Sequence, residues 1–197
     1  MVLAVGDAYE KLRDKLVDEA KRIVVGEGTE PGVTMGPLIT KQHREKVLGY
    51  IEKGIQEGAK LILDGRSYKD PKHPNGYFMG PCVFDEVTPD MTIGREEIFG
   101  PVLCIMRAKD FDDAVTIVQR HELGNATSIF TSSGRWAREY RYRVEPSMMG
   151  INIGVAAPMA FFPFGGAKNS FFGDLKAHGA DSVEFFTDKK VVISRWW

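Results

Sequence analysis

The 197-residue sequence has little cysteine and no excess of charge of either sign. It contains two cysteines, 26 lysines and arginines, and 27 aspartates and glutamates, which give a formal net charge of −1. A chain of this length buries a core without cross-links, so Cys82 and Cys104 predict reduced, packed thiols rather than a disulfide framework or a metal pair. The balanced charge provides no field that would attract nucleic acid or an acidic membrane.

Long apolar runs are also missing. The most apolar stretch, residues 148–166, is interrupted by Asn152, Pro158, Pro163 and several glycines. It therefore lacks the roughly 20 unbroken apolar residues that a membrane-spanning helix needs. Residues 1–5 have no basic region and reach Gly6 too early for a secretory signal. We therefore expect a globular, cytoplasmic protein without a membrane partner.

Apolar residues recur every three or four positions in residues 7–25 and 40–57, which predicts two amphipathic helices, the second capped by Thr40. A strand over residues 60–64 and an extended segment over 77–87 follow. The glycine-rich residues 26–32 superficially resemble a dinucleotide-binding fingerprint. Because a helix precedes them and Pro31 stands in place of the third glycine, they predict a surface loop.

From residue 101 onward, strands and helices alternate. Apolar strands are predicted over residues 102–107, 126–131 and 148–153. The helices between them have capping residues, Asp110 for the first and Ser132 or Ser133 for the second. This order predicts right-handed crossovers, a parallel sheet and the α/β fold class. A short helix over 179–186 and a strand over 189–195, which we expect to pair in this subunit or another, complete the chain.

Few residues suggest catalysis by themselves. His43, His73, His121 and His178 are scattered, lack metal-binding spacing and are expected to be surface or satisfied side chains, with His73 solvated in a turn-rich segment. We therefore expect no metal site. Arginines and aromatic residues interleave over 135–143, a pattern explained on a helix by one apolar stripe and one solvated basic face.

One motif differs in kind, Arg-Glu-Glu-Ile-Phe-Gly-Pro-Val at residues 95–102. It joins a carboxylate, an aromatic ring and a Gly-Pro turn directly before a buried strand. Glu97 could accept hydrogen bonds from vicinal sugar hydroxyls, while Phe99 could offer a flat wall to a planar heterocycle. A capped turn without ligand is the alternative from the residues alone.

This motif resembles the signature of the aldehyde dehydrogenase superfamily. Further matches, in the same order and spacing, occupy residues 35–39, 76–78, 111–118 and 164–168. More narrowly, the glycine- and phenylalanine-rich residues 150–174 resemble the methylmalonate-semialdehyde dehydrogenase branch. Ala167 departs from the pattern, because relatives commonly carry a larger residue there, and this puts the local pocket shape in doubt.

The resemblance implies a catalytic-domain-like parallel sheet flanked by helices over residues 1–186, followed by an oligomerisation strand over 187–197. It implies that Glu97 binds the ribose hydroxyls of the nicotinamide half of NAD and that Phe99 packs beside the nicotinamide. The residues of the substrate tunnel would be Phe161, Phe162 and Phe164. The cofactors of the whole enzyme would be NAD and coenzyme A, its substrate a small semialdehyde, and its assembly a homo-oligomer.

The family's reaction begins with attack of a cysteine thiolate on the aldehyde. Neither Cys82 nor Cys104 stands in the family's nucleophile motif, so we expect the nucleophile, the general base and the Rossmann-like NAD domain to lie upstream. The expected function is the C-terminal portion of a coenzyme A-acylating semialdehyde dehydrogenase, inactive and without tight cofactor binding by itself, which could associate with an N-terminal portion. The alternatives are a non-catalytic interaction module and a fragment of a hydrolytic aldehyde dehydrogenase.

Overall fold

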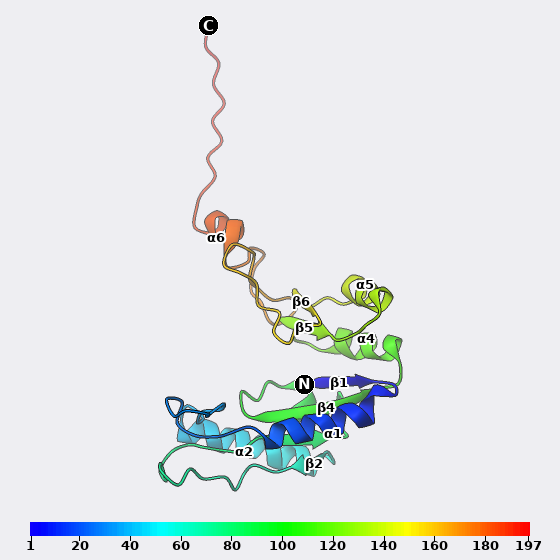
Figure 1. The fold of residues 1–197 in the computed structure, drawn as a ribbon. Helices are drawn as coiled ribbons and strands as arrows, with labels where there is room; N and C mark the ends of the chain where they lie inside the picture. Colours follow the sequence, from blue (N-terminus) through cyan, green and yellow to red (C-terminus); the bar gives the residue numbers. More distant parts are fainter. The chain divides into compact units, whose positions relative to one another are not determined.

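The computed structural model describes all 197 residues and divides them into two compact units, Met1–Ile117 and Val118–Trp197. The first unit is built on a four-stranded sheet with the order β1-β4-β3-β2. Its strands are β1 (Val2–Val5), β2 (Lys60–Leu63), β3 (Cys82–Asp85) and β4 (Val102–Ala108). β4 runs parallel to β1 and β3, whereas β2 is antiparallel to β3 (Figure 1).

Helices cover both faces of this sheet. They are α1 (Ala8–Lys21), α2 (Lys41–Gln56) and the short α3 (Thr92–Arg95). Successive residues of a strand point to opposite faces. Val83 and Ile105 therefore pack in the cluster that contains α1 residues, while Phe84 and Met106 pack in the cluster that contains α2 and α3 residues. Burial on both faces explains why residues 82–84 of β3 and 102–106 of β4 are apolar without interruption.

The predicted helices form, and their ends follow from capping. The hydroxyl of Thr40 accepts a hydrogen bond from the backbone N–H of His43 at 3.0 Å, which confirms the predicted N-cap of α2. Gly58, just beyond the helix, has a φ of +97° that favours glycine. Sequence reasoning missed β1, whose four residues are too few to show a period.

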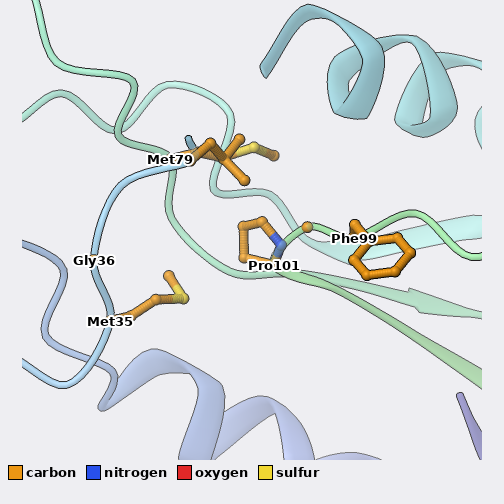
Figure 2. A pocket seen from close by; sticks show the side chains of 7 residues that line it. Met35, Gly36, Met79, Phe99 and Pro101 are labelled. Atoms are coloured by element: carbon orange, nitrogen blue, oxygen red, sulfur yellow. The ribbon is translucent and has the colours of Figure 1, made fainter. Parts of the chain in front are cut away.

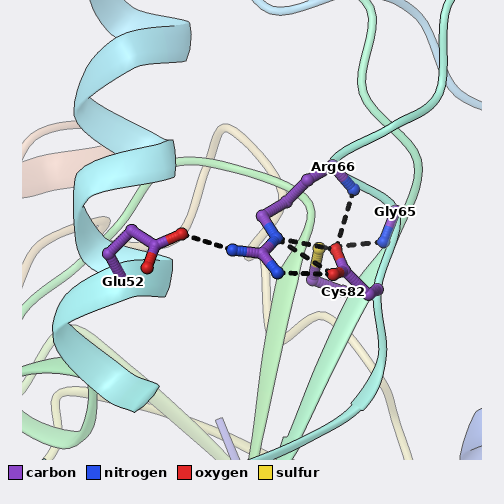
Figure 3. A network of polar contacts seen from close by, with 5 residues as sticks. Glu52, Gly65, Arg66 and Cys82 are labelled. Carbon is purple, nitrogen blue, oxygen red and sulfur yellow. Dashed lines mark hydrogen bonds and ion pairs between the residues drawn. The ribbon is translucent and has the colours of Figure 1, made fainter. Parts of the chain in front are cut away.

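A charged network ties α2 to the turn after β2 (Figure 3). The guanidinium of Arg66 bonds the carboxylate of Asp64, with Nη2 to Oδ2 at 2.6 Å, and also reaches Glu52 of α2. These bonds raise the pKa of Arg66 and hold that of Asp64 below its ordinary value. The adjacent Gly65 donates its N–H to the sulfur of Cys82 at 3.3 Å. The turn therefore has a fixed position against β3.

The second unit contains the end of α4 (Phe111–Arg120) and a parallel pair of strands, β5 (Ala126–Ile129) and β6 (Met148–Ile151). Its other helices are α5 (Gly134–Arg143) and α6 (Gly179–Phe185). Asp110 caps α4 and Ser133 caps α5, as predicted. The α/β fold class is confirmed. The three later strands do not share one sheet, however, because β4 belongs to the four-stranded sheet and β5 pairs only with β6.

Residues 187–197 form no helix or strand, so the strand predicted over 189–195 has no pairing partner within this chain. Their side chains are exposed, including Val191, Ile193 and Trp196. The oligomerisation strand therefore stays a prediction about contact with another subunit. None of the helices combines the length and apolar character needed to cross a bilayer.

Candidate cofactor corner and aromatic segment

The motif around Glu97 forms a turn between α3 and β4. Ile98 points into the core and is 7% exposed, which anchors the turn. Its neighbours Glu97 and Phe99 point outward, and the ring of Phe99 is 72% exposed. The buried residue between them therefore holds two candidate ligand-binding side chains on the surface of one turn.

The backbone of this turn is unusual at Phe99, which has a φ of +55°. Such left-handed geometry is uncommon for a side chain larger than asparagine and needs support from its surroundings. Nε2 of His43 lies 2.6 Å from the carbonyl oxygen of Phe99. The next residue, Gly100, accepts from the N–H of Val102 at 2.7 Å. The turn is thus held by backbone contacts on both sides of the exposed ring.

The two adjacent glutamates have different environments. Glu96 accepts a hydrogen bond from the hydroxyl of Tyr50 in α2 at 2.6 Å, and this bond raises the pKa of Tyr50. Glu97 is exposed, and its carboxylate makes no hydrogen bond or ion pair within the chain. Both oxygens of Glu97 are therefore available to an external donor, which is what binding a pair of vicinal hydroxyls requires.

A pocket of about 450 Å³ lies beside the turn (Figure 2). Its lining is mainly apolar and consists of Met35, Gly36, Leu38, Met79, Phe99, Gly100 and Pro101. Sequence reasoning matched residues 35–39 to the family without giving them a role. The fold brings them to this place because the N–H of Leu38 bonds the carbonyl of Tyr77 at 3.0 Å, which ties the segment before α2 to the segment before β3.

The two thiols are packed in the core, as predicted. Cys82 is fully buried and Cys104 is 4% exposed. Burial raises the pKa of both, that of Cys104 to about 11. A thiol must ionise to act as a nucleophile. Neither residue is therefore suited to attack an aldehyde.

The predicted tunnel residues lie in the second unit, in a segment that folds back on itself. Phe164 donates its N–H to the carbonyl of Ala177 at 2.6 Å, and its ring stacks on His178 with centroids 5.5 Å apart. The rings of Phe161 and Phe162 contact each other at 4.7 Å. All three phenylalanines are more than one third exposed. They form one aromatic segment, and its contact with substrate stays a prediction.

Sequence reasoning missed two lysines that hold this segment. Nζ of Lys168 donates to the carbonyls of Gln119 and His121 at 2.6 and 3.1 Å, at the end of α4. Nζ of Lys176 donates to the carbonyl of Gly166 at 2.6 Å. A positive charge at a helix C-terminus is favourable. The only signal in the sequence was their place within and after the matched motif at residues 164–168.

The structure thus brings Glu97 and Phe99 together in the first unit, and Phe161, Phe162 and Phe164 together in the second. No group of three or more histidine, cysteine, aspartate or glutamate side chains is placed to hold a metal ion. The candidate site offers a free carboxylate, an exposed ring and an apolar pocket. Such a set can bind a sugar diol joined to a planar heterocycle.

Comparison with known proteins gives consistent matches. The model of the aldehyde dehydrogenase family matches residues 1–192. A malonate-semialdehyde dehydrogenase of Halalkalibacterium halodurans is 46% identical over 196 residues, which are 100% of this chain and 40% of that protein. Malonate-semialdehyde dehydrogenase 1 of Geobacillus kaustophilus is 48% identical over 195 residues, which are 99% of this chain and 40% of that protein. The chain therefore spans about 40% of the length of these relatives.

Solved structures agree with this relation. A methylmalonate-semialdehyde dehydrogenase from Sinorhizobium meliloti, complexed with NAD, has a TM-score of 0.96 and 42% identity, and the match covers 100% of this chain and 40% of that one. A methylmalonate-semialdehyde dehydrogenase from Oceanimonas doudoroffii has a TM-score of 0.94 and 45% identity, with 100% and 41% covered.

Proposed function

The chain belongs to the aldehyde dehydrogenase family, and from this premise we propose that it forms part of an NAD-dependent, coenzyme A-acylating dehydrogenase of malonate or methylmalonate semialdehyde. The names of its relatives support the substrate class. The observation that carries the cofactor role is the turn at residues 96–100, where the unpaired carboxylate of Glu97 stands two residues from the exposed ring of Phe99.

The chemistry of this turn fits NAD. The two oxygens of Glu97 can each accept a hydrogen bond from a ribose hydroxyl, and charge-assisted bonds of this kind are stronger than neutral ones. Phe99 can pack against the nicotinamide and limit its movement. When bound, NAD supplies the acceptor for the hydride that leaves the substrate. The part of Glu97 and Phe99 is to bind and orient it.

The attacking thiolate comes from outside these 197 residues, in this proposal. The support is the burial of Cys82 and Cys104, which raises the pKa of both thiols.

Phe161, Phe162 and Phe164 would give the substrate an apolar wall that excludes water. Exclusion of water would favour transfer of the acyl group to coenzyme A over hydrolysis. Residues 187–197 would pair with another subunit, because their exposed apolar side chains are a surface that water does not favour.

Binding by the turn is tested with nicotinamide mononucleotide, the half of NAD that Glu97 and Phe99 would contact. Titrated into the isotope-labelled chain, it should shift the backbone amide resonances of residues 96–100, even if the affinity is weak. Glu97→Gln should weaken binding about 10-fold or more, because a hydrogen bond to a charged group contributes about 1.5–3 kcal/mol. Glu96→Gln is the matched control, since the carboxylate of Glu96 is already bonded to Tyr50.

Adenosine monophosphate serves as the control ligand and should leave these resonances unchanged. Equal shifts with both nucleotides would contradict the assignment to the nicotinamide half. Absence of any response at millimolar nicotinamide mononucleotide would contradict the cofactor role of the turn.

The reaction is tested by NADH formation from malonate or methylmalonate semialdehyde. The enzyme that contains these residues should form an acyl thioester only when coenzyme A is present, while a free acid as the product would favour the hydrolytic alternative. Turnover by the 197-residue chain alone would contradict the external origin of the thiolate.

A further inference from the structure

One face of α2 contacts the candidate cofactor turn at three successive points. His43, Val47 and Tyr50 are four and three residues apart, a spacing that places them on the same side of a helix. The imidazole of His43 meets the carbonyl of Phe99, and the hydroxyl of Tyr50 meets the carboxylate of Glu96. Between them, Val47 is fully buried against the turn. The helix therefore holds the turn at both ends and in the middle.

The imidazole of His43 is itself well placed. Its residue lies in the first turn of α2, where its backbone N–H is fixed by the hydroxyl of Thr40 at 3.0 Å. Nε2 is 2.6 Å from the carbonyl oxygen of Phe99. A carbonyl oxygen can only accept, so Nε2 carries the hydrogen and donates it. The residue as a whole is half-buried.

The backbone of Phe99 needs such a contact. Its φ of +55° is disfavoured for a residue with a Cβ atom. The ring is 72% exposed, so packing of the side chain contributes little to hold this conformation. Restraint must act through the peptide groups on either side, and the bond from His43 acts directly on one of them.

We propose that His43 is a positioning residue for the cofactor turn, which holds the peptide of Phe99 in the left-handed conformation that presents its ring beside the carboxylate of Glu97. This rests on the proposed function of the turn. A residue that presets the binding conformation improves affinity because less of the bound arrangement has to be formed on binding. His43 touches no ligand in this role and acts only through Phe99.

The test compares three variants of the 197-residue chain. His43→Leu removes the donor, and His43→Gln keeps an N–H donor at a similar distance from the backbone. Gln42→Leu is the matched control, because it adds the same leucine at the neighbouring exposed position of α2. The first readout is the pair of ¹³Cα and ¹³Cβ chemical shifts of Phe99, which report its backbone conformation without any ligand. The second is the affinity for nicotinamide mononucleotide.

His43→Leu should move the Phe99 shifts toward extended values and weaken nucleotide binding about two- to tenfold, as expected for loss of one hydrogen bond. His43→Gln should restore both, and Gln42→Leu should change neither. The resonances of β3 and β4 should stay in place in all three variants. A general loss of structure in His43→Leu would move them together with those of Phe99.

Unchanged Phe99 shifts in His43→Leu would overturn the inference. So would altered shifts with unaltered affinity. If the unsubstituted chain binds no nicotinamide mononucleotide, the proposed function fails and this inference fails with it. If binding is intact but insensitive to His43→Leu and sensitive to Glu97→Gln, only the inference is overturned.

Discussion

Gly100 lies so close to α2 that an added methyl group has no room. An ideal Cβ atom on Gly100 would be 2.7 Å from Cγ2 and 2.9 Å from Cγ1 of Val47, a fully buried side chain. Inserting a methyl group into a packed core costs about 1–3 kcal/mol, because neighbours leave their preferred rotamers. We therefore expect Gly100→Ala to lower the free energy of unfolding by about that amount.

The same geometry predicts that a second substitution relieves the first. Val47→Ala removes both Cγ atoms and costs roughly 1–3 kcal/mol alone, from lost burial and the cavity that remains. In the double variant, the methyl group at position 100 occupies part of that cavity. Gly100→Ala should then cost less than it does alone, by at least about 0.5 kcal/mol, which is the range of coupling between residues in contact.

Urea unfolding followed by far-ultraviolet circular dichroism measures all four species of this cycle. Gly49→Ala is the control for a glycine-to-alanine change without a clash. Gly49 lies on α2, the helix that carries Val47, and nothing lies within 4 Å of its Cβ position. There, alanine should stabilise by about 0.8–1 kcal/mol through helix propensity. Additive effects of Gly100→Ala and Val47→Ala would refute the packing argument, and so would a neutral Gly100→Ala.

Two further predictions concern titrating groups. Burial raises the pKa of Cys104 to about 11, so iodoacetamide should modify both thiols far more slowly in the folded chain than in urea, and equal rates would contradict the buried placement. The hydrogen bond from His73 at 2.9 Å, followed by the backbone N–H of Lys72, holds the pKa of the Asp70 carboxyl below its ordinary value. The ionised Asp70 carboxylate therefore stabilises the fold fully above the pKa that this group has in the unfolded chain. This stabilisation is lost as the pH falls below about 4. The melting temperature of Asp70→Asn should therefore fall less on acidification than that of the unsubstituted chain, and parallel curves would contradict the assignment.

Local signals in the sequence were sufficient for most elements of the fold. Thr40, Asp110 and Ser133 marked the starts of three helices because their side chains accept bonds from backbone N–H groups only a few residues away. The sequence was less informative about which strands pair and in which direction. The antiparallel direction of β2 and the separation of β5 and β6 from β4 depend on contacts between distant segments.

His73 shows the same limit for single side chains. Its turn-rich surroundings predicted a solvated ring, and the side chain is 44% exposed, but the ring also bonds the carboxylate of Asp70, which is 5% exposed and which the sequence did not indicate as a partner. The residues between them gave no sign that this carboxylate is covered.

The sequence by itself determined the family, the α/β class and the residues of the motif, because order and spacing of residue types survive without coordinates. Glu97 and Phe99 were identified in this way. Only the tertiary structure decided that Glu96 is bonded while Glu97 is free, that Met35 and Met79 share a pocket beside Phe99, and that His43 reaches the carbonyl of Phe99 across 56 residues. Hydrogen bonds and close packing act over a few ångströms, so they depend on which distant segments the fold brings into contact.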